Sequence, residues 1–156
     1  ALVVFSADCG TILLEDPVTG AVGACHAGWR GTALGIAQKT VEAMTAAFGC
    51  DPKNIRAALG PCISPCCFET DGDVPEAMTA ALGDQAAPAI TRQGEKYHVD
   101  LKYLNRTFLQ NAGIVPAHMD TSSLCTACDP ELFWSARRHG DRRGSLGAVI
   151  TAGGPR

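Results

Sequence analysis

Short apolar runs and turn residues alternate over the first thirty positions of the chain. Three of these runs predict strands, at residues 1–5, 11–14 and 21–24. The segment Asp16–Gly20 between the second and third runs contains proline and glycine, which are typical of a turn between antiparallel strands. We therefore expect the second and third strands to form a β-hairpin.

The register of this hairpin decides which side chains meet. If the turn centres between Pro17 and Val18, Cys9 and His26 are cross-strand neighbours. A slip of one residue places Cys9 opposite Cys25 instead, on the other face of the hairpin from His26. The first register brings a thiol and an imidazole close enough to share a metal ion or to form a reactive Cys-His pair.

Apolar residues recur at helical spacing in three longer segments: residues 32–48, 73–82 and 101–111. A glycine follows each of them closely and predicts where the helix ends: Gly49, Gly83 and Gly113. Asp100 directly precedes the third segment and is expected to cap it.

Further strands are predicted at residues 54–59, 90–92, 96–99, 132–136 and 145–152. Strands and helices interleave, but both predicted hairpins are antiparallel. This favours an α/β (α+β) fold, a layered mixed β-sheet sandwich flanked by helices, over a doubly wound parallel sheet. We expect one domain over residues 1–152 and a flexible tail at 153–156. Because the chain starts inside a strand and without Met, we expect it to be a C-terminal fragment of a longer protein.

The composition and net charge limit the classes of partner that the protein can bind. A hydrophobic fraction of 46% and a charged fraction of 19% are ordinary for a globular protein. The net charge of −3 disfavours nucleic acid, and no apolar run approaches the roughly 20 residues of a membrane helix. We expect a cytoplasmic protein that binds small molecules; nothing in the sequence sets its oligomeric state.

The basic segment Arg137–Arg143 is either a solvated loop or an anion site.

Eight cysteines are present, and we expect them to be reduced thiols because the chain is long enough to fold without disulfide staples. Cys125 and Cys128 form a CxxC motif, but no second CxxC accompanies it. The pattern therefore does not predict a four-thiolate zinc site. Cys66 and Cys67 are expected to be small, half-buried packing residues.

His26 lies where a strand ends and a helix has not yet begun. Gly28 and Gly31 allow a tight turn with exposed backbone N–H groups, next to Trp29 and Arg30. A helix start that follows glycine can hold an anion, and arginine adds a bidentate charge. This loop therefore combines a metal ligand or base, an anion seat and an aromatic wall.

A catalytic zinc site needs at least three protein ligands. The hairpin supplies two, Cys9 and His26, and the spacing selects none of the other histidines as a third. Asp8 either orients a ligand through a hydrogen bond or caps the backbone at the strand end.

Four segments occur in the order typical of a known family: residues 6–9 (SADC), 26–31 (HAGWRG), 60–63 (GPCI) and 133–138 (FWSARR). With them, residues 1 to about 151 resemble the YfiH-like laccase-domain family, also called the multicopper polyphenol oxidase or purine nucleoside phosphorylase family. The HAGWRG run is the most specific of the four. The last segment departs from the family's usual Phe-Phe-Ser-Tyr-Arg-Arg.

The resemblance implies a metal site. In this family a zinc ion is held by residues that match Cys9 and His26, and by a His in an upstream Gln-Val-His-Gly segment that this sequence does not contain. Copper is the alternative ion, but holding several copper ions needs many histidines and the chain has four. Multicopper oxidation of phenols is therefore disfavoured.

The resemblance also implies phosphorolysis of purine nucleosides (adenosine, inosine and methylthioadenosine), with adenosine deamination as a second activity. Arg30 and Arg137 are the expected catalytic residues, because charge is needed near phosphate and the breaking glycosidic bond. The expected substrate-binding residues are Gly28, Trp29, Gly31 and Ser135. Two alternatives stay open: a metal-free hydrolase with Cys9 as nucleophile and His26 as base, and a catalytically silent fragment or binding module.

Overall fold

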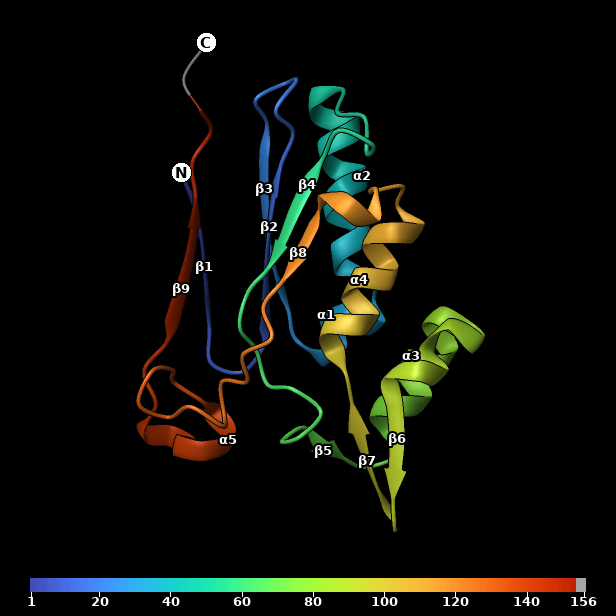
Figure 1. Ribbon diagram of the computed structural model, residues 1–156, viewed down its shortest axis with the longest axis vertical. Coiled ribbons are helices and arrows are strands. Elements are labelled where there is room, and N and C mark those ends of the chain that lie inside the picture. Colours follow the sequence, from blue (N-terminus) through green and yellow to red (C-terminus); the bar gives the residue numbers. More distant parts are fainter. Residues whose placement is uncertain (154–156) are drawn as a thin grey trace.

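The computed structural model describes residues 1–153 and has a mixed α+β architecture (Figure 1). Its central sheet has four strands in the order β3 (Val22–Ala27), β2 (Gly10–Glu15), β4 (Arg56–Leu59) and β8 (Met119–Thr121). The β3–β2 and β2–β4 pairs are antiparallel, whereas β4 and β8 are parallel. The predicted layered, mixed-sheet fold class is confirmed.

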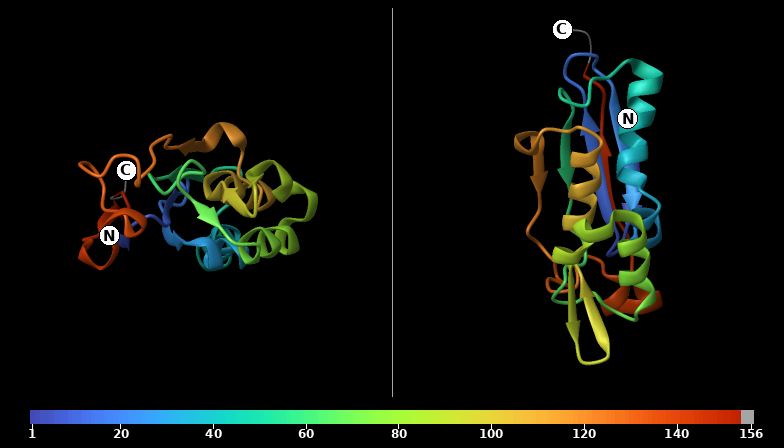
Figure 2. Two further views of the ribbon diagram at one scale, coloured as in Figure 1. Left: turned by 90° about the horizontal axis from the view of Figure 1, so that it is seen from below. Right: turned by 90° about the vertical axis from the view of Figure 1, so that its right-hand side faces the viewer.

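Helices cover one face of the central sheet (Figures 1 and 2). They are α1 (Trp29–Ala33), α2 (Ile36–Phe48) and α4 (Leu101–Asn111). Apolar side chains of the sheet and of these helices form a first core, whose members include Ile12, Leu14, Val41, Leu109 and Ile114. This packing fixes the ends of β2 and β3, where the HAGWRG run begins.

A two-stranded antiparallel ribbon lies on the other side of the sheet (Figure 1). It pairs β1 (Leu2–Ser6) with β9 (Leu146–Ile150), so the two ends of the described chain are neighbours. The short helix α5 (Ala136–His139) lies at the end of this ribbon that is also close to the start of β2. The chain leaves β1 at Ser6 and passes through Ala7–Cys9 into β2.

A second, smaller unit contains a three-stranded sheet in the order β5 (Glu69–Thr70), β7 (Lys96–Val99) and β6 (Ile90–Gln93), with α3 (Asp73–Leu82) beside it. It has its own core, which includes Phe68, Met78, Val99 and Leu104. Helix α4 contributes to both cores, with Leu104 on this side and Leu109 on the other. Three 3₁₀ helices complete the described elements: Gly83–Ala89, Pro116–His118 and Gly140–Arg142.

Most of the predicted elements are confirmed. The helices over 73–82 and 101–111 have the predicted bounds, and the second is capped by Asp100, whose carboxylate accepts a hydrogen bond from the Tyr103 amide at 3.0 Å. The strands near 1–5, 11–14, 21–24, 54–59 and 145–152, and the hairpin of 90–99, are also present. β5 and β8, of two and three residues, were not predicted.

Three predictions are wrong. The helix predicted over 32–48 is broken, because Gly35 adopts a left-handed conformation (φ 70°) between α1 and α2. Residues 132–136 are not a strand; they lead into α5, which Ser135 caps. The hairpin register is shifted by two residues: Thr11, not Cys9, lies opposite His26.

The register follows from the turn. The Asp16 amide donates to the Ala21 carbonyl, and the Asp16 carboxylate accepts from the Val18 amide at 2.8 Å, which centres the turn between Val18 and Thr19, one residue later than predicted. Within residues 1–153, no helix is long and apolar enough to cross a membrane. The predicted flexible tail lies, apart from Gly153, outside the described residues.

Candidate functional site

Cys9 and His26 approach the same point in space although they are not directly paired. A slip of two residues keeps a side chain on its face of the sheet, so the two side chains still share a face. A Cβ placed on Gly28 would lie 2.9 Å from Cys9 Sγ and 3.5 Å from His26 Nε2. Gly28 thus leaves a small space that both ligand atoms border.

The orientation of the His26 ring is set by β1. Its Nδ1 lies 3.0 Å from the Phe5 carbonyl oxygen, which can only accept a hydrogen bond. Nδ1 therefore carries the proton, and Nε2 of the neutral ring keeps a free lone pair. This is the usual arrangement of a histidine that binds a metal or accepts a proton.

Asp8 is the buried anchor of the site. It has a positive φ of 88°, which is rare for a residue other than glycine. One carboxylate oxygen accepts from Thr126 Oγ1 at 2.6 Å; the other accepts from Ser135 Oγ at 2.9 Å and from the Arg137 amide at 2.7 Å. Asp8 therefore joins two distant segments, the loop of Thr126 and the start of α5, directly beside Cys9, and such strained residues concentrate at functional sites.

A pocket of about 430 Å³ opens next to Asp8 and Cys9. Its apolar and aromatic walls include Trp29, Phe68 and Leu101, and Arg137 lines it as well. The size and the mixture of apolar walls with a few polar groups are typical of a small-molecule site.

Arg137 is held in place by the backbone beside Phe68. Its guanidinium donates to the Cys67 carbonyl at 3.2 Å and to the Glu69 carbonyl at 3.0 Å, and it lies 5.9 Å from the centre of the Phe68 ring. The aromatic ring and the charge therefore form one rigid wall. Sequence reasoning missed Phe68, which belongs to no motif, and Thr126, because the CxxC motif around it draws attention to its cysteines and not to the residues between them.

The other predicted site residues have different roles. Arg30 is exposed, and its guanidinium stacks on the Trp29 ring at 4.2 Å. A Cβ on Gly31 would approach the His26 carbonyl to 3.4 Å, so this glycine allows close packing of the turn. The anion seat expected at the helix start would lie at α1, which has only five residues and therefore a small dipole.

Ser135, one of the predicted substrate-binding residues, lies beside Asp8 at the start of α5. It is completely buried, its hydroxyl donates to Asp8, and it accepts from the Arg138 amide at 3.1 Å. The hydroxyl is thus engaged within the protein. Ser135 positions Asp8 and the start of α5.

Charge and burial shift the pKa values of the thiols at the site. Burial raises the pKa of Cys9, the Asp8 carboxylate raises it further, and Arg143 lowers it. Burial also raises the pKa of Cys62 to about 12, which is consistent with a neutral packing residue in the GPCI turn.

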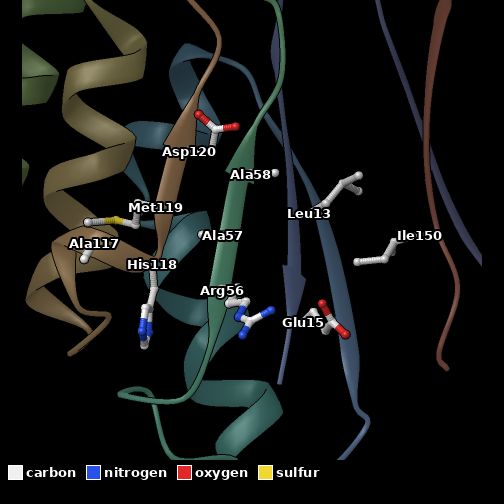
Figure 3. Close-up of a pocket in the computed structure, with 10 residues that line it drawn as sticks. All are labelled: Leu13, Glu15, Arg56, Ala57, Ala58, Ala117, His118, Met119, Asp120 and Ile150. Carbon is white, nitrogen blue, oxygen red and sulfur yellow. The ribbon is translucent and has the colours of Figure 1, made fainter. Parts of the chain in front are cut away.

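A larger hollow of about 750 Å³ lies on the open face of the central sheet, toward β9 (Figure 3). Its polar side chains do not converge: Figure 3 shows His118 and Asp120 at opposite ends, and Glu15 and Arg56 are cross-strand partners along β2 and β4. This hollow lacks a set of groups that could act on one reacting atom. The pocket beside Cys9 is therefore the better candidate.

The pocket beside Cys9 offers two of the at least three protein ligands that a catalytic zinc ion needs. A thiol and an imidazole nitrogen with a free lone pair border the space left by Gly28, and both are common zinc ligands. Within residues 1–153, no third His, Cys, Asp or Glu atom joins them as a close group. His98 and His139 instead lie against the backbone oxygens of Pro65 and Ser135.

Comparison with known proteins places the chain among nucleoside-processing relatives. A family model described as multi-copper polyphenol oxidoreductase laccase matches residues 1–153. The chain is 36% identical over 144 residues to the purine nucleoside phosphorylase YlmD of Bacillus subtilis. This match covers 92% of this chain and 52% of that protein. It is 39% identical over 140 residues to the adenosine deaminase RL5 of an unknown prokaryotic organism, covering 89% of this chain and 53% of that protein.

The fold has a close counterpart among solved structures. The crystal structure of the Bacillus licheniformis hypothetical protein YfiH has a TM-score of 0.89 and 38% identity, and the match covers 93% of this chain and 55% of that chain. The chain thus spans about half the length of these relatives.

Proposed function

The chain belongs to the multi-copper polyphenol oxidoreductase laccase family, and on that premise we propose that it forms part of a zinc-dependent purine nucleoside phosphorylase. The proposed substrates are adenosine, inosine and methylthioadenosine, together with phosphate. Adenosine deamination is the proposed second activity. The relatives named above, a purine nucleoside phosphorylase and an adenosine deaminase, support this reaction class.

One observation carries the proposal: Cys9 Sγ and His26 Nε2 border the same space at Gly28, and Cys9 also lines the pocket that contains Asp8 and Arg137. This arrangement puts a pair of metal-ligand atoms next to a cavity of nucleoside size. The proposed third ligand is a histidine from outside this sequence, as the family resemblance implies.

The pocket residues suit a purine nucleoside and an anion. Trp29 and Phe68 offer aromatic faces on which a planar base can stack. The Arg137 guanidinium, fixed by two backbone carbonyls, provides a positive charge for the attacking phosphate anion. Asp8 holds the Arg137 backbone in position.

Zinc bound by Cys9 and His26 would supply a Lewis acid that activates water at neutral pH, which deamination requires. Phosphorolysis draws on the other groups, because it needs an oriented phosphate and a stabilised sugar cation. His26 Nδ1 stays bound to the Phe5 carbonyl throughout, so the ring keeps its orientation. We prefer zinc to copper because Cys and His in an open site are typical zinc donors.

The test uses two substitutions that act on the ligand pair. Cys9→Ala removes a ligand, and Gly28→Ala places a methyl group 2.9 Å from Cys9 Sγ, where it displaces the sulfur. We expect each variant to lose about 100-fold or more of its phosphate-dependent adenine release and its zinc. Gly147→Ala is the matched control, since its added methyl would make only an ordinary contact of 3.5 Å with the Phe5 ring.

Metal analysis by mass spectrometry and chromatography of the released base give the readouts. Full turnover by metal-free protein, or by Cys9→Ala, would contradict the proposal. If a single low-pKa thiol at Cys9 is alkylated in metal-free protein that still turns over substrate, the Cys-His hydrolase reading replaces it.

A further inference from the structure

Two pairs of cysteines, about sixty residues apart in sequence, converge on one side of the smaller unit. The sulfur atoms of Cys66, Cys67, Cys125 and Cys128 all lie within 4.8 Å of one another. Cys128 Sγ is 3.6 Å from Cys66 Sγ and 3.5 Å from Cys67 Sγ. Among residues 1–153, this is the one group of three or more such donors close enough to share an ion.

The cluster corrects two sequence expectations. The CxxC motif of Cys125 and Cys128 has a partner after all, but it is the adjacent pair Cys66 and Cys67 rather than a second CxxC. Cys66 is exposed rather than half-buried, whereas Cys67 is half-buried as expected, beside the other thiols. We call these four residues the four-cysteine cluster.

The backbone brings the two loops together. Cys62 and Cys125 form a parallel β-bridge, and the Thr126 amide donates to the Cys62 carbonyl at 3.3 Å. A turn then brings the Cys67 amide to the Ser64 carbonyl at 2.9 Å, and a second turn brings the Cys128 amide to the Cys125 carbonyl at 3.2 Å. These hydrogen bonds hold both pairs of thiols in register without any covalent link.

We propose that the four-cysteine cluster is a structural metal site that binds one Zn²⁺ ion through four thiolates. A tetrahedral zinc site with Zn–S bonds of about 2.3 Å has sulfur–sulfur edges of about 3.8 Å. The sulfur separations of the cluster, 3.5 and 3.6 Å for two pairs and at most 4.8 Å for all, match such a tetrahedron. Four soft thiolates in this arrangement select zinc over magnesium, calcium and manganese, which prefer oxygen ligands.

Nearby groups offset the negative charge of four thiolates. The Ser64 amide points at Cys125 Sγ at 3.4 Å, as backbone amides do toward metal-bound thiolates. Lys102 Nζ lies between the same two loops and donates to Ser64 Oγ at 2.9 Å and to the Leu124 carbonyl at 2.8 Å. The site therefore has both polar donors and a cation beside it.

The ion would brace the walls of the pocket. Cys67 precedes Phe68 and its carbonyl holds Arg137, while Thr126 lies between the cysteines of the CxxC motif and holds Asp8. Zinc in the four-cysteine cluster would lock both loops to one another. This inference goes beyond the proposed function and does not depend on a metal at Cys9 and His26.

The test uses cobalt(II) as the probe, because tetrahedral tetrathiolate cobalt has an intense and characteristic visible spectrum. Purified protein is stripped of metal under reducing conditions and titrated with Co²⁺, then with Zn²⁺. We expect one equivalent of cobalt with the tetrathiolate spectrum, displaced by zinc. The double variant Cys66→Ser, Cys128→Ser should lose this spectrum, whereas Cys9→Ala and the control Cys50→Ser should keep it.

A second measurement does not depend on how the variants fold. Zinc added to the unaltered protein should protect the four thiols from alkylation, as read by peptide mass spectrometry. An octahedral or absent cobalt spectrum with four freely alkylated thiols would overturn the proposal. A disulfide within the cluster in protein purified without reductant, which zinc and reductant do not convert to a metal site, would overturn it as well.

Discussion

Asp8 occupies a position that few other side chains could fill. Its backbone is left-handed, and its carboxylate accepts three hydrogen bonds from Thr126, Ser135 and Arg137 while almost fully buried. Asparagine also tolerates positive φ, so a change to asparagine alters the hydrogen bonding more than the backbone. The role of the carboxylate can therefore be measured separately from the strain.

Asp8→Asn should lower the free energy of unfolding by about 1–3 kcal/mol, because the new amide group must face at least one donor and leaves it unsatisfied. The matched control is Asp71→Asn, which breaks an exposed ion pair with Lys96 and should leave the stability nearly unchanged, because solvent screens such a pair. Urea unfolding followed by circular dichroism measures both. Equal losses in the two variants would show that the buried network contributes nothing beyond an exposed contact.

The sequence predicted some residues of the site but not their partners. Cys9, His26 and Arg137 carry chemistry that a motif displays, and their positions follow from local strand and turn patterns. The hydroxyl of Ser135 looked available in the sequence but is engaged by Asp8. Which groups a hydroxyl contacts depends on segments more than 100 residues away, and no local pattern contains that information.

At the scale of elements, local signals predicted where helices end. Asp100 caps α4, and Gly49 and Gly83 follow α2 and α3 because a glycine backbone adopts conformations that other residues avoid. Gly35 carried the same signal inside an apolar helical pattern, and the periodicity concealed it. The break matters because it separates α1, which carries Trp29, from α2.

Gly35→Ala should lower the free energy of unfolding by about 1–2 kcal/mol, because alanine is strained at a φ of 70°. Gly49→Ala, at a φ of 69° on the other end of α2, should cause a similar loss. Only the first should also alter the surroundings of Trp29. Fluorescence in a Trp134→Phe background, alongside urea unfolding, separates the two effects. A spectral shift in the Gly49 variant alone would contradict this assignment.

The hairpin register is an element-scale error with a physical cause. Pattern alone placed the centre of the turn between Pro17 and Val18, whereas the Asp16 carboxylate and the Asp16–Ala21 backbone hydrogen bond centre it one residue later. The error was two residues, an even number, so Cys9 and His26 stayed on one face. A one-residue error would have separated them.

At the scale of the molecule, two hydrophobic cores share α4, and the second core lines the pocket with Ile63, Phe68 and Leu101. The first core packs the central sheet against α2, and the second packs α3 and the smaller sheet. Cys125 belongs to the second core, and two short loops join the four-cysteine cluster to the pocket. The sequence could not predict this convergence, because the two cysteine pairs are some sixty residues apart and only the tertiary fold brings them together.

Removing zinc from the four-cysteine cluster should loosen the second core before the first, since binding to the native state stabilises the parts that form the site. After chelation, hydrogen exchange should speed up at the Thr126 amide and at Ile63, which donates to the Asp8 carbonyl. The amides that pair β2 with β3 should keep their protection. Exchange followed by mass spectrometry measures both regions.

The Cys9→Ala variant serves as the control for this experiment, because it removes the proposed metal site at Cys9 and His26 but keeps the four-cysteine cluster. Chelation should therefore still speed up hydrogen exchange at the cysteine loops of this variant. The Cys66→Ser variant should resemble the chelated protein before any chelator is added. Equal loosening of β2–β3 and of the cysteine loops would mean that the ion acts on global stability alone. Loosening confined to the cysteine loops would instead establish that one bound ion determines how firmly the Asp8 and Arg137 walls of the pocket are held.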